Sequence, residues 1–149
     1  MANLVWSAPS HQVDAQTAKH RILSQHEQIR ALLQRAGAVA EASLDGKPLA
    51  PSEVADAIDD ICMIIEVHLD FEESVLLPIL RLDDLMLGAE GRAEKLITDH
   101  QSQRAMLTAL CREARAFPQL PMLAAKLAFL TSWLAADMKE EERALLREA

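Results

Sequence analysis

Apolar residues recur along this chain at alternating steps of four and three, and this spacing constrains the fold more than any other feature. Two such runs are Val54, Ile58, Ile61, Ile65 and Leu123, Leu127, Leu130, Leu134. The spacing places side chains on one face of an α-helix, so each run predicts a helix with an apolar stripe. The 149 residues include 25 alanines and 23 leucines but no tyrosine and only 14 valines and isoleucines. Because strands favour β-branched and aromatic residues, the sequence predicts an all-α protein.

Proline and glycine residues divide the chain into four long helical segments. We predict helices over about 14–36, 52–77, 92–116 and 121–149, with a connector over 38–51 and a link over 79–91. The first helix is expected to end at Gly37, because glycine commonly terminates helices. The second is expected to end before Pro78, because proline disfavours helical geometry in the residue that precedes it. Four long helices with short links favour an up-down-up-down four-helix bundle.

The length of the chain suits one domain. We predict a single domain over 1–149, with an N-terminal arm over 1–13 and the bundle over about 14–148. The formal net charge of −8 has the wrong sign for nucleic-acid phosphates or an anionic membrane surface. No run of about 18 apolar residues occurs, and residues 1–10 lack the basic region and apolar stretch of a signal peptide. We therefore expect a cytoplasmic protein that binds neither nucleic acid nor a membrane.

Histidines and carboxylates interrupt the apolar stripes at one level of the predicted bundle. Six residues take inward positions there: His26, His68, Glu72, His100, Asp137 and Glu141. The first and third helices contribute one each, and the second and fourth each contribute a pair four residues apart. With a rise of about 1.5 Å per residue, all six lie roughly 8–16 Å from the same end of the bundle. Three imidazoles and three carboxylates are therefore expected to share one volume.

This cluster would bury three carboxylates, which is costly without cations because each loses its hydration. Two divalent ions would balance the three negative charges. Imidazole and carboxylate suit iron, manganese or zinc, and bundle cores commonly hold paired metals bridged by carboxylates. A single inward histidine is more often a hydrogen-bonded core residue, and residues 140–142 are a charge run typical of a solvated face. The convergence of all six residues at one height favours a metal site.

Residues 68–78, HLDFEESVLLP, resemble the H-x-x-x-E-E-x-x-L-x-P segment of the hemerythrin-like, HHE cation-binding family. His26 and His100 resemble the single histidines of the family's first and third helices. Residues 133–141 resemble its final H-x-x-x-E, with Asp137 in the histidine position. The resemblance implies a hemerythrin-like bundle with two iron ions, and these ligands: His26 and His68 on one ion, His100 and Asp137 on the other, and Glu72 and Glu141 as bridges.

The chain departs from the oxygen-carrying members of the family at two ligand positions. Arg104 stands where they have a second histidine on the third helix, and Asp137 stands where they have a histidine on the fourth. The resemblance to an oxygen carrier is therefore weak. The second metal position is expected to bind its ion weakly or to prefer another ion, with zinc and manganese as alternatives to iron.

We interpret the chain as a non-haem di-iron protein that binds, senses or reacts with dioxygen, nitric oxide or peroxide. The alternatives are a carboxylate-bridged di-metal oxidoreductase or peroxidase, and a metal-free bundle used for protein interaction. Turnover with a reductant would distinguish the enzyme from the binding protein, and metal analysis would distinguish both from the interaction bundle. The sequence leaves open whether the chain is an enzyme, which protein partner it has and whether it forms a homodimer.

Overall fold

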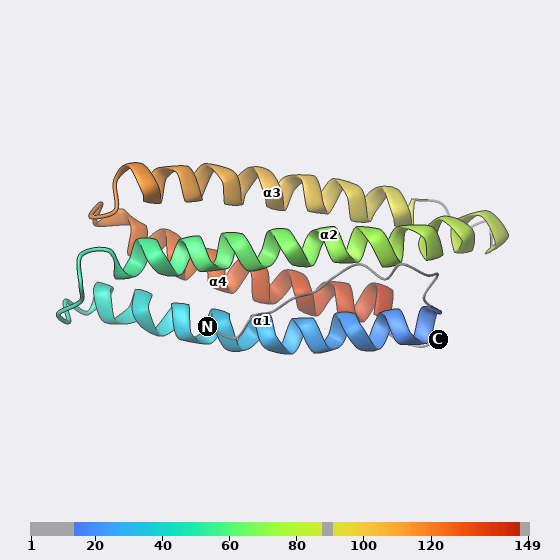
Figure 1. Ribbon diagram of the computed structural model, residues 1–149, viewed down its shortest axis with the longest axis horizontal. Helices are drawn as coiled ribbons and strands as arrows, with labels where there is room; N and C mark the ends of the chain where they lie inside the picture. The colour runs from blue at the N-terminus through green and yellow to red at the C-terminus, as the bar shows by residue number, and fades with distance from the viewer. Residues whose placement is uncertain (1–13, 88–90, 147–149) are drawn as a thin grey trace.

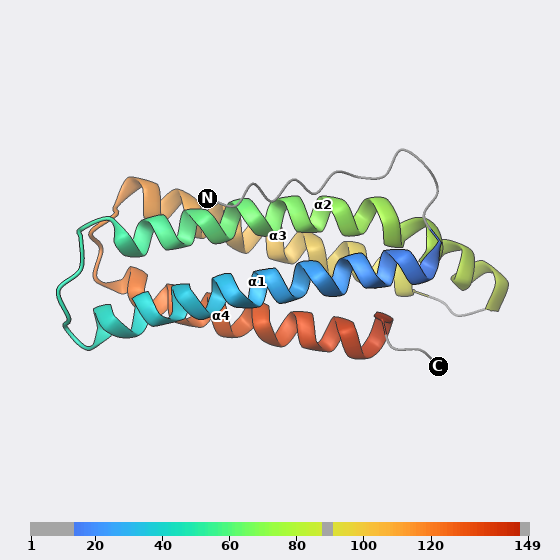
Figure 2. The same cartoon turned by 60° about the horizontal axis from the view of Figure 1, so that its bottom comes forward.

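The four expected helices are present and run alternately up and down one bundle. The computed structural model describes residues 14–87 and 91–146. Its elements are α1 (Ala15–Leu44), α2 (Glu53–Leu87), α3 (Arg92–Ala116), α4 (Met122–Glu141) and the short π-helix η1 (Glu142–Leu146). Figures 1 and 2 show the helices side by side along the long axis, and the described residues contain no strand. The prediction of an all-α four-helix bundle is confirmed, whereas the predicted arm over 1–13 lies outside the described residues.

α1 extends beyond its predicted end, because Gly37 lies within the helix and does not terminate it. Three of the next five residues are alanine, and Ala40 among them is fully buried. Their helix propensity and this burial outweigh the cost of roughly 1 kcal/mol for a glycine inside a helix. The C-cap is Asp45, and Gly46 follows with a φ of +71°, a left-handed conformation that favours glycine. The predicted connector over 38–51 is correspondingly shorter.

α2 also passes its predicted end and continues through Pro78 to Leu87. Proline removes one backbone donor from a helix, but Leu80 beyond it gains burial. Leu80 is only 2% exposed and belongs to an apolar cluster with side chains of α1 and α3. The predicted link over 79–91 is therefore mostly helix, and Figure 1 shows the end of α2 projecting beyond the other helices.

The helix predicted over 121–149 is divided into two elements. α4 begins at Met122, and after Glu141 the chain adopts the wider π-helical geometry of η1. The change occurs where both Glu141 and Glu142 contact the same residue, His26 of α1. Consecutive residues of an α-helix point about 100° apart, and a wider turn helps two neighbouring carboxylates reach one partner.

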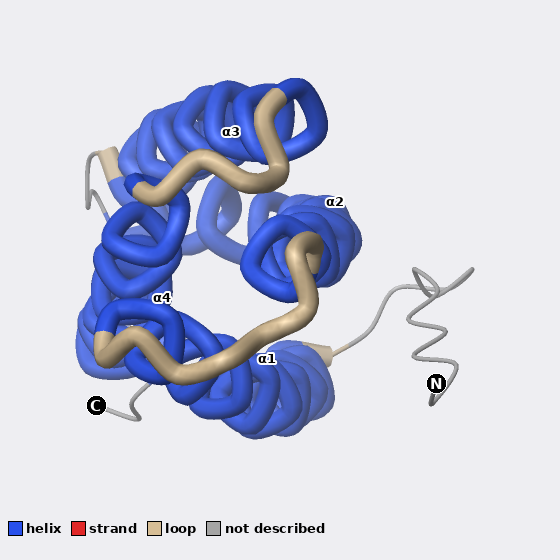
Figure 3. The backbone as a smooth tube through the Cα atoms, turned by 90° about the vertical axis from the view of Figure 1, so that its left-hand side faces the viewer, coloured by secondary structure: helices blue, strands red, loops and turns tan. Residues whose placement is uncertain are grey.

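The inward stripes form two apolar clusters, one on each side of the predicted metal layer. The larger cluster draws on all four helices and includes Ile29, Ile61, Leu107 and Leu127. The smaller one includes Ile22, Phe71 and Leu96. α1 packs closely on α2 and α4, and α2 packs closely on α3, whereas the backbones of α3 and α4 approach each other at few points and these helices meet through side chains. Figure 3 shows the four helices end-on around this interior.

Within the described residues, no helix has the length and apolar content that a membrane span requires.

Candidate metal centre

Glu72 of α2 lies at the centre of the candidate site, with a histidine from each of three helices around its carboxylate. Glu72, His26 and His100 are completely buried and His68 is 3% exposed. Glu72 Oε1 lies 2.8 Å from His68 Nε2 and 3.2 Å from His26 Nε2. Glu72 Oε2 lies 3.1 Å from His100 Nε2. The two oxygens of one carboxylate therefore face different histidines, which is the placement of a carboxylate that bridges two cations.

Glu141 of α4 adds a second carboxylate. Its Oε1 lies 3.5 Å from His26 Nε2. One donor atom from each of four residues falls within 4.8 Å of the other three: His26, His68, Glu72 and Glu141. We call these four residues the first donor group, and His100 with Glu72 Oε2 the second donor group. Two imidazoles and two carboxylates at this spacing suit one iron, manganese or zinc ion.

Three buried polar atoms of the two donor groups have no hydrogen-bond partner in the described structure. They are Glu72 Oε2, His100 Nε2 and Glu141 Oε1. The first two lie 3.1 Å apart, but their orientations do not make a hydrogen bond. An unsatisfied buried polar group costs about 1–3 kcal/mol, so native proteins rarely leave several together. A bound cation would satisfy all three atoms, and the donor set therefore fits a metal.

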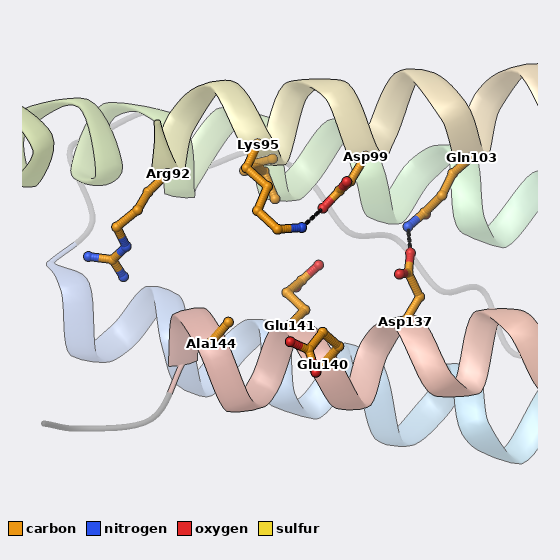
Figure 4. A pocket seen from close by; sticks show the side chains of 9 residues that line it. Arg92, Lys95, Asp99, Gln103, Asp137, Glu140, Glu141 and Ala144 are labelled. Atoms are coloured by element: carbon orange, nitrogen blue, oxygen red, sulfur yellow. Dashed lines mark hydrogen bonds and ion pairs between the residues drawn. The ribbon is translucent and has the colours of Figure 1, made fainter. Parts of the chain in front are cut away.

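Asp137, the sixth predicted ligand, lies outside the first donor group. Its carboxylate accepts a hydrogen bond from Nε2 of Gln103 on α3. Figure 4 shows this contact at one end of a cavity, with Glu141 further along the same helix. The structure thus brings His26, His68, Glu72 and Glu141 together, places His100 against Glu72, and holds Asp137 to one side.

The cavity lies between α3 and α4, the pair of helices whose backbones approach each other at few points. Its volume is about 50 Å³. Nine residues line it: Arg92, Lys95, Leu96, Asp99, Gln103, Asp137, Glu140, Glu141 and Ala144 (Figure 4). Because Glu141 belongs both to this wall and to the first donor group, the cavity adjoins the candidate metal centre.

The three histidines share one orientation, with Nε2 toward Glu72 and Nδ1 toward an oxygen acceptor on the outside. His26 Nδ1 lies 2.9 Å from Glu142 Oε1, and His100 Nδ1 lies 3.0 Å from Glu73 Oε1. The third acceptor is an amide, Gln25 Oε1, 2.8 Å from Nδ1 of His68. These oxygens can only accept, so Nδ1 carries the proton in each histidine. A neutral imidazole in this tautomer offers the Nε2 lone pair to a metal.

The buried charges shift the pKa values of the site. Burial lowers the pKa of His26, but attraction to the nearby carboxylates of Glu141 and Glu72 outweighs it and raises this pKa to about 10. Burial and the neighbouring charge of Glu72 raise the pKa of Glu141 to about 8. Burial also acts to raise the pKa of Glu72, but the charge of His68 and the proximity of His100 and His26 hold it well below its ordinary value. Protonated histidines thus balance the buried carboxylates, and a cation that binds must displace their protons.

Helical spacing alone does not specify which residues hold the histidines. The carboxylates occur as two consecutive pairs, Glu72-Glu73 and Glu141-Glu142. In each pair the first carboxylate faces the donor groups, and the second accepts a hydrogen bond from a histidine of another helix. The doublet is visible in the sequence, but the partner of its second member depends on how the helices pack. A run of acids such as 140–142 is otherwise typical of a solvated face.

Comparison with known families matches residues 17–149 to the hemerythrin HHE cation-binding domain. Comparisons with curated proteins and with solved structures give no match. The family match covers every residue of both donor groups, and it confirms the resemblance inferred from residues 68–78. Cation binding is also the function to which the buried, unsatisfied donor atoms point. The chain therefore belongs to the hemerythrin HHE cation-binding family.

Proposed function

We propose that this protein is a non-haem di-iron protein that binds, senses or reacts with dioxygen, nitric oxide or peroxide. The observation that carries the proposal is the placement of Glu72 between two sets of histidines, with Oε2 unsatisfied although fully buried. One carboxylate that faces two donor groups supports two ions in preference to one. Imidazole with carboxylate supports iron, with zinc or manganese as alternatives.

We assign the ligands of the two proposed ions as follows. His26 and His68 bind the first ion, His100 binds the second, and Glu72 and Glu141 bridge them. Asp137 completes the second position only when its carboxylate leaves Gln103, to which it is hydrogen-bonded. The second ion therefore has the weaker protein coordination and retains open positions for an external ligand.

The size of the cavity beside Asp137 supports a small external ligand. One water molecule needs about 10–15 Å³ of such volume, so a cavity of about 50 Å³ accommodates only a few water-sized molecules. Dioxygen, nitric oxide and hydrogen peroxide fit within this volume. Bound iron would supply the redox chemistry, and the residues of the cavity wall would select the ligand by size.

A carboxylate-bridged oxidoreductase or peroxidase is the second candidate, and the position of Asp137 favours it. Its half-buried carboxylate lies in the cavity wall, where it can exchange protons with a peroxide. Catalytic turnover with added reductant would support this candidate, and stoichiometric ligand binding without turnover would support the sensor or binding protein. The cytoplasmic location and the lack of a nucleic-acid partner stay predictions from composition.

Metal analysis tests the proposal directly. Protein made in iron-sufficient cells and purified anaerobically should contain more than one iron per chain. Its absorption spectrum should change on exposure to air. The proposal would be falsified by folded protein that carries no metal and whose melting temperature does not change when iron is added. The metal-free interaction bundle would then be the remaining alternative. One firmly bound ion would retain the metal site and reject the two-ion form.

A further inference from the structure

We infer that Glu73 and Glu142 are positioning residues, each fixed by an arginine, that orient His100 and His26 and strengthen them as metal ligands. The inference rests on the proposed metal centre and concerns residues outside both donor groups. Glu142 Oε1 lies 2.9 Å from His26 Nδ1 and 2.6 Å from Arg30 Nη2. Glu73 Oε1 lies 3.0 Å from His100 Nδ1 and 2.5 Å from Arg104 Nη1. The same three-residue chain thus occurs on opposite sides of the centre.

The arginines keep these carboxylates ionised and in place. Hydrogen bonds from a guanidinium to a carboxylate are charge-assisted and roughly twice as strong as neutral ones. Arg104 also donates to Glu66 and Asp70, so its own side chain is held at several points. With the guanidinium on one side, each carboxylate has a fixed direction in which to accept the imidazole proton. The side chains of Glu73 and Glu142 are 29% and 23% exposed. The carboxylates therefore keep some contact with solvent, while their hydrogen bonds to the arginines and histidines are partly protected from water.

Arg104 gains a specific role from this arrangement. Its guanidinium contacts Glu73, Asp70 and Glu66, which lie outside both donor groups. Arg104 therefore acts through Glu73 on His100.

His68 provides an internal contrast, because its Nδ1 proton goes to the neutral amide of Gln25. A carboxylate acceptor draws the Nδ1 proton more strongly than an amide does, which makes Nε2 a better electron donor. Stronger donation favours the more highly charged ferric ion over the ferrous ion. The proposed centre thus has two histidines with charged acceptors and one with a neutral acceptor, and exchange of the two acceptor types provides a test.

The variants are Glu73→Gln and Glu142→Gln, with Gln25→Glu as the reciprocal control. Each change keeps the size of the side chain and one acceptor oxygen, and exchanges a charged carboxylate for a neutral amide or the reverse. The affinities for Zn²⁺ and Fe²⁺ and the reduction potential of the iron-loaded protein are measured for each. Loss of an acceptor beyond a metal ligand typically costs 10–100-fold in affinity, and we expect about tenfold for each Glu→Gln change. If the ferric form loses about tenfold more than the ferrous form, the potential rises by about 59 mV.

The sign of the potential shift distinguishes positioning from a structural role. We expect Glu73→Gln and Glu142→Gln to raise the potential and Gln25→Glu to lower it. In Zn²⁺-loaded protein, the Nδ1 proton resonances of His100 and His26 should move upfield in the respective Glu→Gln variants. Because Glu73 and Glu142 lie in different elements, each variant tests the inference by itself if the other does not fold.

Failure of the proposed metal centre and failure of the positioning roles of Glu73 and Glu142 give different results. If the unchanged protein binds neither Zn²⁺ nor Fe²⁺, the proposed metal centre fails and the inference fails with it. If it binds both ions, and the Glu→Gln and Gln→Glu variants leave the potential unchanged or shift it in one common direction, the inference alone is wrong.

Discussion

The two donor groups lie in one layer of the bundle but differ in how completely the protein supplies them. The first group comes from α1 and from α2 and α4, both of which pack on α1, and its four donor atoms fall within 4.8 Å of one another. The second group has only His100 and one oxygen of Glu72. It faces the α3–α4 side, where the helix backbones approach each other at few points, the cavity lies and Asp137 is bound to Gln103.

This difference indicates that the two proposed ions have different roles. Metal sites that hold structure are closed by protein ligands, whereas sites that bind substrate keep an open position. The first position resembles a closed site, and the second resembles an open one beside a small cavity. The arrangement of the helices accounts for this asymmetry, because α1 lies against both α2 and α4 and its His26 meets their donors, whereas the cavity lies between α3 and α4.

Glu72→Gln should give the largest effect, because the two oxygens of Glu72 face the histidines of different positions. Glutamine keeps the volume but offers one acceptor oxygen, so it cannot bridge two ions. We expect the affinity for both ions to fall by roughly 100-fold or more. This loss exceeds the cost of removing a residue that is only hydrogen-bonded to a metal ligand. The increase in melting temperature on addition of metal should largely disappear, since that increase follows from binding to the folded state.

The matched control for this change is Asp60→Asn, an exposed carboxylate on the same helix. It should leave metal content and the metal-dependent increase in melting temperature unchanged. If Glu72→Gln loses only one ion, Glu72 binds at one position only. The statement that Glu72 links the two positions would then be wrong.

The inward residues were predictable because helical periodicity determines them. His68 and Glu72 continue the spacing of Ile58, Ile61 and Ile65, so their orientation follows from the apolar stripe and needs no tertiary information. The fold class was predictable for the same reason. The helix ends were less so, because burial of Ala40 and Leu80 outweighs the local effects of Gly37 and Pro78.

The partners of these inward residues were not predictable from spacing. Asp137 was expected at the metal, but Gln103 on the facing helix competes for its carboxylate. Glu73 and Glu142 each follow an inward carboxylate by one position. Their contacts depend on where Arg104 and Arg30, which belong to other helices, are placed. Such contacts depend on the relative heights and rotations of packed helices, which helical periodicity does not specify.

The pH dependence of stability should separate the metal-free and metal-bound forms. Without metal, His26 contributes stability below its ordinary pKa of 6.5, and loses this contribution as pH rises through about 10. Glu141 acts in the same direction, because its pKa is raised from 4.5 to about 8. The metal-free protein should therefore lose stability as pH rises from 4.5 to about 10. Glu72 has the opposite sign, and its contribution is lost only as pH falls through its lowered pKa.

Bound metal should reverse this trend, because protons and cations compete for the same donors. For each proton released, affinity rises about tenfold per pH unit, so the metal-dependent increase in melting temperature should grow with pH. Melting curves with excess Zn²⁺ and with chelator, recorded across this pH range, measure the difference. Parallel curves would mean that binding displaces no protons and that the ions do not bind at His26 and Glu141.

Asp137→His should reduce the difference in affinity between the two positions, because it adds a stronger ligand to the second position only. Histidine restores the residue type of the family motif and removes one negative charge from the second position. We expect about tenfold tighter binding of the second ion, with the first ion unaffected, and a higher reduction potential because a neutral ligand replaces an anionic one. Imidazole is longer than the carboxylate group, so Leu134 one turn earlier must adjust slightly. Metal titration against a competing chelator gives the two affinities, and equal second-ion affinities would place residue 137 outside the coordination sphere.

Gln103→Leu should produce the smallest effect, and it tests whether Gln103 keeps Asp137 from the second ion. Gln103 is 7% exposed, and leucine fills a similar volume without a hydrogen-bond donor. A hydrogen bond to a charged group contributes about 1.5–3 kcal/mol, part of which water in the cavity replaces. The released carboxylate should therefore bind the second ion roughly fivefold more tightly, a difference of about 1 kcal/mol. Gln101→Leu, at an exposed position on the same helix, is the control and should leave both affinities unchanged. Calorimetric titration with Zn²⁺ measures both variants, and weaker second-ion binding in Gln103→Leu would show that Gln103 holds Asp137 in its working position.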